Sequence, residues 1–221
     1  GKEVELIILR LEGPLQSWGE QSKWDDRDTA SMPTKSGVVG LLACCLGYER
    51  GDARIKRLSD ELSMSVRADR AGKIMTDFHT VQGRPAIMNA EGKPRSGGNT
   101  FITHRSYLQD AAFLVVLSGK DMLLRLCADA LEKPVWAPFL GRRSCVPSKP
   151  VFLELTSQYE SPESALRRYP LEERADKKPL YQLECENGAA VRMDRLTDPA
   201  NRLFGARRVS VTGVLEEGVP S

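Results

Sequence analysis

The sequence predicts an α+β fold in which helices cover an antiparallel sheet, and three observations support that expectation. Apolar, β-branched stretches typical of strands alternate with stretches whose apolar residues have helical spacing. A polar tract at about 82–104, punctuated by glycine and proline, is too long for an ordinary turn, and such tracts are usually either functional or disordered. Residues 156–221 are interrupted by prolines and keep mainly short strand-like stretches.

The first half of the chain predicts a strand, two helices and a hairpin. The leading strand ends before Gly13 and Pro14, a pair that favours a turn. The first helix is capped by Thr34 or Ser36 and stops at Gly47, since helices commonly begin after a hydroxyl residue and end before glycine. In order, the expected elements are a strand at 4–11, helices at 38–46 and 54–62, and a hairpin of 64–70 with 73–81 around Ala71-Gly72.

The second half predicts a strand at 107–118, a helix at 121–131 and a strand at 151–155. The resulting order is close to the split β-α-β arrangement of ferredoxin-like domains. We therefore expect residues 1–155 to form a ferredoxin-like domain with an insertion at about 82–104. The remainder, 156–221, is expected to be a small, mostly β C-terminal subdomain, with strands at 180–185, 189–193 and 207–215.

The composition excludes several classes of protein. The chain has 221 residues, 41% of them hydrophobic, and a nearly neutral formal net charge of +2. No apolar run reaches the roughly 18 residues of a membrane span, and the first residues lack a signal-peptide pattern. Five cysteines without C-x-x-C spacing and only two histidines argue against a disulfide framework and a metal site. We expect a cytoplasmic protein with no cofactor, no metal and no membrane partner.

The charges are segregated along the chain. Residues 29–48 and 133–153 contain no acid, and 78–109 contain only one. Acids are concentrated at 49–69 and 154–186. Such segregation can form a basic groove on a nearly neutral protein. Scattered, solvated charge is the alternative interpretation.

The strongest single motif is a pair of adjacent arginines in the stretch Phe139-Leu-Gly-Arg-Arg-Ser-Cys-Val-Pro-Ser-Lys-Pro150. Arg142 and Arg143 follow Gly141 and lie between Pro138 and Pro147, so the loop is stiff and loses little entropy on binding. A guanidinium presents donors in a fixed fork that suits carboxylate or phosphate. The alternative is a surface pair that closes onto the acidic C-terminal part.

Two loops offer further contacts for an anion or a base. The start of the first helix combines free N–H groups with Lys35 and could hold one phosphate. The alternative there is ordinary capping, and the nucleotide-binding P-loop is excluded because threonines, Thr29 and Thr34, replace its two glycines. Trp18 could stack on a base of a single strand. It could equally close the rim of the core, and this second interpretation is slightly favoured.

His79 and His104 flank the insertion and suggest a metal-independent endoribonuclease, in which one group takes the 2′-hydroxyl proton and another protonates the leaving oxygen. Tyr107 or Arg105 could assist. A histidine within a strand is more often structural, and the insertion leaves the distance between the two histidines open.

Four motifs together resemble the CasD family, the 5′-handle-binding subunit of the type I-E CRISPR surveillance complex Cascade. They are Gly13-Pro-Leu-Gln-Ser-Trp-Gly19, Pro33-Thr-Lys-Ser-Gly-Val-Val-Gly-Leu-Leu42, Asp77-Phe-His-Thr-Val81 and Pro138-Phe-Leu-Gly-Arg-Arg-Ser-Cys145. The likeness extends over residues 4–155, and the last third resembles the family only in length and general character.

This resemblance implies a modified ferredoxin-like, RRM-like domain that holds the 5′ handle of crRNA and contacts the large subunit and the adjacent backbone subunit, with target DNA reached only indirectly. The insertion would be the thumb, with Arg84, Lys93 and Arg95 facing the partner. The family member of type I-E systems is non-catalytic, whereas a type I-C relative cuts precursor RNA. If this chain were an enzyme, its catalytic residues would be His79, His104 and Tyr107. The RNA-binding residues would be Gln16, Trp18, Lys35, Ser36, His79, Thr80, Arg105, Gly141, Arg142, Arg143 and Ser144. A pure protein scaffold is a third hypothesis.

Overall fold

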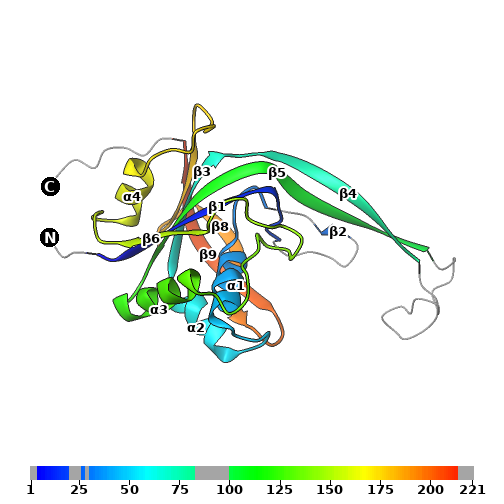
Figure 1. The fold of residues 1–221 in the computed structure, drawn as a ribbon, viewed down its shortest axis with the longest axis horizontal. Helices are drawn as coiled ribbons and strands as arrows, with labels where there is room; N and C mark the ends of the chain where they lie inside the picture. The colour runs from blue at the N-terminus through cyan, green and yellow to red at the C-terminus, as the bar shows by residue number, and fades with distance from the viewer. Residues whose placement is uncertain (1–3, 20–25, 28–29, 83–99, 214–221) are drawn as a thin grey trace.

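The computed structural model describes residues 4–19, 26–27, 30–82 and 100–213. Within these ranges one sheet of nine strands carries four helices (Figure 1). None of the helices in this part of the chain is long and apolar enough to cross a membrane. In chain order the elements are β1 (Leu6–Gln16), β2 (Asp26–Arg27), α1 (Lys35–Leu46), α2 (Ala53–Glu61), β3 (Ser63–Arg70), β4 (Lys73–Gln82), β5 (Thr100–Ser118), α3 (Asp121–Glu132), β6 (Phe152–Thr156), α4 (Pro162–Arg168), β7 (Leu180–Glu184), β8 (Ala190–Asp198) and β9 (Leu203–Thr212).

The central strands confirm the predicted fold class. In the sheet, β6, β1, β5 and β3 lie side by side in this order, and each adjacent pair is antiparallel. With α1 between β1 and β3 and α3 between β5 and β6, the chain follows the β-α-β-β-α-β order of ferredoxin-like domains.

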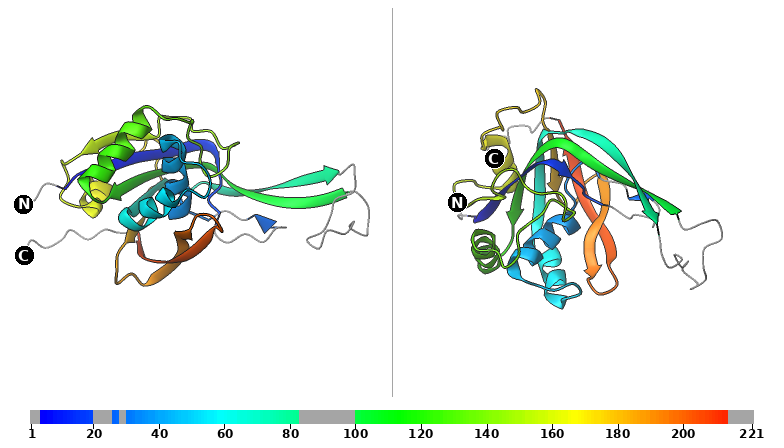
Figure 2. Two further views of the ribbon diagram at one scale, coloured as in Figure 1. Left: turned by 90° about the horizontal axis from the view of Figure 1, so that it is seen from below. Right: turned by 45° about the vertical axis from the view of Figure 1, so that its right-hand side comes forward.

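The helices cover the two faces of the sheet unequally. The larger hydrophobic core lies between the sheet and α1, α2 and α3, and a smaller one lies on the opposite face under α4 (Figure 2). Successive residues of β1 pack into the two cores in turn: Ile7 and Leu9 face the three helices, whereas Ile8 faces α4. Burying each such side chain contributes about 1.5–3 kcal/mol.

The caps of the first helix agree with the sequence. Thr34 is the N-cap, and its hydroxyl accepts a hydrogen bond from the Gly37 N–H at 3.2 Å. Gly47 ends the helix, where its N–H donates to the last turn.

The predicted hairpin of 64–70 with 73–81 is wrong. Strands β3 and β4 do not pair with each other, because both pair with the long strand β5. The register of Arg70 with Ala112 continues without a shift into Lys73 with Gln109. The favoured two-residue hairpin turns need positive φ at both residues or at the first one, whereas here only the second residue, Gly72, is positive, at 73°. The glycine therefore bends one continuous strand.

Strands β4 and β5 form a two-stranded ribbon that projects from the body, as Figures 1 and 2 show. The predicted insertion at about 82–104 therefore begins and ends in regular strand, at Gln82 and from Thr100 onward. Its central part, with the predicted partner contacts Arg84, Lys93 and Arg95, lies outside the described residues.

The C-terminal part extends the same sheet. Strand β7 pairs with β3, β9 with β7, and β8 with β9, and β8 also packs on α2. The three predicted strands are present at nearly the expected positions. The prolines of this part do not predict helix α4, because proline commonly interrupts a helix. Pro162 nevertheless stands in the first turn after the Ser161 N-cap, where proline is favoured. The division of the chain into a domain at 1–155 and a subdomain at 156–221 stays a prediction.

Candidate nucleic-acid interface

Three of the four motifs that the sequence singles out meet around Trp18. A Cβ placed on Gly37, in the first turn of α1, would lie 2.7 Å from the indole carbon Cε3 of Trp18. A Cβ placed on Gly141 would lie 3.5 Å from the same carbon. The loop after β1, the start of α1 and the arginine loop at 139–145 are therefore in direct contact.

Trp18 and Gln16 lie inside this junction and do not face solvent. Both side chains are fully buried. The Gln16 amide donates to the carbonyls of Leu11 and Ala111 at 3.0 and 2.9 Å and accepts the Trp18 indole N–H at 2.9 Å. Their burial corrects the prediction that either side chain contacts RNA. The alternative interpretation of Trp18 as a core residue agrees with the structure.

Lys35 is also buried, and its position corrects the predicted phosphate site at the start of α1. Its ammonium group pairs with the Glu184 carboxylate at 2.8 Å, and its backbone N–H donates to Asp194 at 2.9 Å. The helix N-terminus is thus already occupied by a carboxylate of the protein. Ser36 lies beside the cap, 3.5 Å from the Thr34 hydroxyl.

A buried ion pair holds that carboxylate in place. The guanidinium of Arg207 lies 2.7 Å from Asp194 and 3.5 Å from Glu184, and both Arg207 and Asp194 are almost completely buried. Burial raises the pKa of Asp194, but the hydrogen bond and charge of Arg207 and the Lys35 N–H outweigh it, so the pKa lies below its usual value. Strands β8 and β9 are thereby joined to the start of α1.

The arginine loop is held rigidly against the loop after β1. Leu140 donates to the Cys145 carbonyl at 2.8 Å, and Cys145 donates back to the Arg142 carbonyl at 2.9 Å. The Ser17 N–H donates to the Leu140 carbonyl at 3.1 Å. Gly141 has a φ of 88°, and any Cβ at this position would overlap the Ser17 carbonyl oxygen. The predicted stiffness of the loop agrees with these contacts.

The two arginines leave this loop in different directions. The Arg142 guanidinium lies over the Tyr107 ring, 4.9 Å from its centroid, at the root of the β4–β5 ribbon. Arg143 and the neighbouring Ser144 are exposed. None of the ion pairs between described residues uses Arg143. Lys149, six residues further along the same stretch, does meet the acidic C-terminal part, 4.0 Å from Glu172.

The strand register separates two of the three residues named for the endoribonuclease alternative. In the ribbon His104 lies opposite Phe78, and His79 lies opposite Thr103. Neighbouring positions of a strand belong to opposite faces, so positions 79 and 104 are on different faces of the ribbon. Tyr107 is buried and covered by Arg142. The register therefore gives no support to the alternative in which His79, His104 and Tyr107 act together.

The remaining predicted RNA-binding residues lie along the ribbon. Arg105 is partly buried and stands opposite Asp77 in the register, one position from Ser106, whose carbonyl accepts the Ser17 hydroxyl at 3.2 Å. Thr80 belongs to β4, opposite Ile102. The exposed Phe78 and His104 rings meet edge to face, with centroids 4.8 Å apart.

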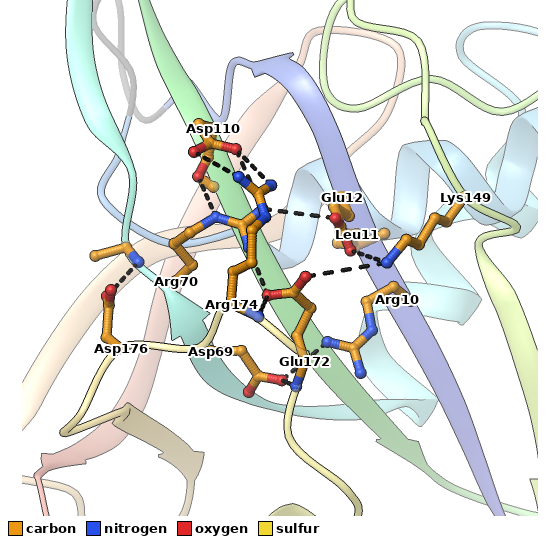
Figure 3. A network of polar contacts seen from close by, with 12 residues as sticks. Arg10, Leu11, Glu12, Asp69, Arg70, Asp110, Lys149, Glu172, Arg174 and Asp176 are labelled. Atoms are coloured by element: carbon orange, nitrogen blue, oxygen red, sulfur yellow. Dashed lines mark hydrogen bonds and ion pairs between the residues drawn. The ribbon is translucent and has the colours of Figure 1, made fainter.

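An ionic network at the ribbon root was not foreseen from the sequence (Figure 3). Arg70, almost buried, pairs with Glu172 at 2.5 Å and with Asp110 at 3.2 Å, and Arg174 pairs with the same Asp110 at 3.1 Å. Asp110 has a φ of 56°, and it stands beside the bend at Gly72. The acid-rich segment of the sequence therefore folds back onto internal arginines, and the arginine loop keeps its exposed positive charge.

Metal ligands are not gathered anywhere in the part of the chain that the structure describes: no three His, Cys, Asp or Glu side chains lie together as a metal would require.

Known proteins resemble this chain over most of its length. The profile of a family described as "CRISPR-associated protein (Cas_Cas5)" matches residues 6–210. The "CRISPR system Cascade subunit CasD" of Escherichia coli (strain K12) is 37% identical over 175 residues, which are 74% of this chain and 76% of that protein. A solved structure described as "CRISPR RNA-guided surveillance complex" aligns with a TM-score of 0.74 at 34% identity, covering 94% of this chain and 89% of the other. A second, "Crystal structure of Cas protein", aligns with a TM-score of 0.72 at 36% identity, covering 94% and 93%.

Proposed function

Because this chain belongs to the Cas5 family of CRISPR-associated proteins, we propose that it is a non-catalytic subunit of a Cascade surveillance complex that binds the 5′ handle of the crRNA. The proposed partners are the crRNA, the backbone subunit and the large subunit of that complex. The relative named as a Cascade subunit and the structural neighbour described as an RNA-guided surveillance complex support this proposal.

The observation that carries the RNA-binding part is the arginine loop. It is rigid, it stands at the root of the ribbon, and it presents Arg143 to solvent while Arg142 covers Tyr107. A charge-assisted hydrogen bond from such a group to phosphate contributes about 1.5–3 kcal/mol. A preformed loop loses little conformational entropy when it binds, so most of that free energy is available for affinity.

The mixed chemistry of the surroundings suits single-stranded RNA with a fixed bend. Such RNA is recognised through splayed bases and backbone contacts together, by aromatic, amide and guanidinium groups. The exposed Phe78 and His104 rings, the partly buried Arg105 and the exposed Ser144 offer aromatic, guanidinium and hydroxyl groups on the ribbon and the loop. A uniformly basic face is not required.

The test is retention of small RNA in the assembled complex. Replacing both Arg142 and Arg143 by alanine should abolish retention of the crRNA. The matched control replaces another adjacent pair, Arg167 and Arg168 of α4, which lies on the opposite face of the sheet. We expect that control to retain RNA, and affinity of the wild type to fall by about 0.7 log unit per log unit of salt for each phosphate contacted. Equal retention by the two double variants would contradict the proposal.

Catalysis is tested separately by incubating the full chain with repeat RNA in EDTA. We expect no specific cleavage, because the two histidine positions lie on opposite faces of the ribbon. Cleavage that His104→Ala or His79→Ala removes would replace this proposal by the endoribonuclease.

A further inference from the structure

A tryptophan outside all four motifs is exposed on the segment that follows α3. Trp136 has 47% of its surface exposed, and its neighbour Val135 has 62%. The segment is nevertheless fixed: the Val135 N–H donates to the Cys45 carbonyl at 2.9 Å, and the Cys44 thiol donates to the Ala137 carbonyl at 3.5 Å. An exposed indole on a rigid backbone is ready to bind without ordering a loop.

Arg143 lies on the other arm of the loop and is exposed. Burial is the larger influence on the Cys44 thiol and raises its pKa, while the nearby Arg143 charge acts in the opposite direction. The Trp136 carbonyl lies 3.7 Å from the Cys44 sulfur. The backbone that carries the indole is therefore held at Cys44, on the C-terminal half of α1, and the Arg143 charge acts on the same thiol.

We propose that Trp136 and Arg143 form a second contact for the crRNA, in which the indole stacks on a base and the guanidinium binds an adjacent phosphate; this inference rests on the proposed function. The RNA would then pass from the Tyr107–Arg142 contact at the ribbon root, along the arginine loop, to the C-terminal half of α1. Trp136 is the added residue, and its ligand is a base of single-stranded RNA.

The charge of the loop favours RNA over a protein as the occupant. Residues 133–153 contain no acid, while Arg142, Arg143 and Lys149 lie on this stretch. Every base has a face on which an aromatic ring can stack, so one flat side chain beside a cation suffices for a nucleotide. A protein partner that covers Trp136 and Val135 is the outcome that the experiment must exclude.

The first experiment measures the affinity of the full chain for a synthetic RNA with the 5′ sequence of the RNA that co-purifies with the complex. Trp136→Ala should weaken binding by about 5- to 150-fold, the range for loss of one base-stacking contact. Trp136→Phe should keep most of the affinity, because it keeps an aromatic face. The control Met122→Ala removes a side chain that is 83% exposed on α3 and should leave the affinity unchanged.

The second experiment uses the native cysteines as reporters. Cys44 is half-buried and Cys185 is exposed, whereas Cys45, Cys127 and Cys145 are buried. When the same RNA is added, alkylation of Cys44 by a maleimide should slow markedly, and alkylation of Cys185 should stay constant as an internal reference. In the Trp136→Ala variant this protection should be reduced.

The outcomes separate this inference from the function on which it rests. If Arg142→Ala with Arg143→Ala abolishes RNA binding while Trp136→Ala binds normally and Cys44 reacts at the same rate with and without RNA, the second contact does not exist and the proposed function stands. If Trp136→Ala keeps its RNA affinity but no longer joins the other subunits, the surface belongs to a protein partner and the inference is overturned. If the wild type binds no RNA, both proposals fail.

Discussion

Replacing Gly141 by alanine adds one methyl group at the centre of the candidate interface, and the structure predicts a large effect. The residue has a φ of 88°, where a side chain costs about 1–2 kcal/mol. The new Cβ would overlap the Ser17 carbonyl oxygen and lie 2.7 Å from the Ser17 carbonyl carbon. Overpacking of this kind costs about 1–3 kcal/mol.

Together these terms lower the free energy of unfolding by about 2–5 kcal/mol. In a domain of 150–250 residues each kcal/mol shifts the melting temperature by about 2–4 °C, so Gly141→Ala should melt about 4–20 °C below the wild type. Relief of the overlap requires the loop to move away from Ser17. Both arginines would then move with it, and RNA retention should fall as well.

The matched control is Gly40→Ala in the middle of α1. A Cβ there meets no atom within 4 Å, and alanine in a helix interior is about 0.5–1 kcal/mol more favourable than glycine. Gly40→Ala should therefore melt at or above the wild-type temperature and retain RNA. Thermal melting followed by circular dichroism checks both variants. A Gly141→Ala protein that melts with the wild type and retains RNA would refute the close approach of the two loops.

Two further predictions concern the ionic networks. Asp194→Asn leaves Arg207 buried beside a neutral partner and should cost about 3–5 kcal/mol at pH 7, measured by urea unfolding. Because the pKa of Asp194 is lower in the folded state, its stabilisation is present above the unfolded pKa of about 3.9 and is lost as the pH falls through the folded pKa, so the difference between the two proteins should shrink on acidification below about pH 4. A difference that stays constant from pH 7 to pH 3 would contradict this linkage. Asp110→Ala removes the carboxylate shared by Arg70 and Arg174 and should accelerate amide hydrogen exchange in β4 more than in β1. Equal acceleration in the two strands would show that the network does not hold the ribbon root.

The order of the elements followed from the sequence because its signals are local. The apolar run of β1, the Thr34 cap and the Gly47 stop of α1 each depend on a few adjacent residues. The stiffness of the arginine loop was also predictable, since Pro138 and Pro147 restrict the backbone on either side of it.

The pairing of strands and the burial of polar side chains depend on contacts that no local pattern carries. Ala71-Gly72 has the composition of a turn, yet β5 is long enough to pair with both β3 and β4, so the chain continues in one direction through the bend. Gln16 accepts the Trp18 indole N–H and donates to two backbone carbonyls, so both side chains can be buried together.

The charged residues show the same division between local signals and long-range contacts. The separation of basic and acidic residues into different stretches can be read directly from the sequence, and so can the arginine pair on a stiff loop. Which of these cations are neutralised depends on the tertiary structure. Lys35 forms an ion pair with Glu184, from a strand far along the chain, whereas Arg143 remains exposed. The physical reason is that a salt bridge depends on distance in space, and folding alone sets that distance for residues far apart in the sequence.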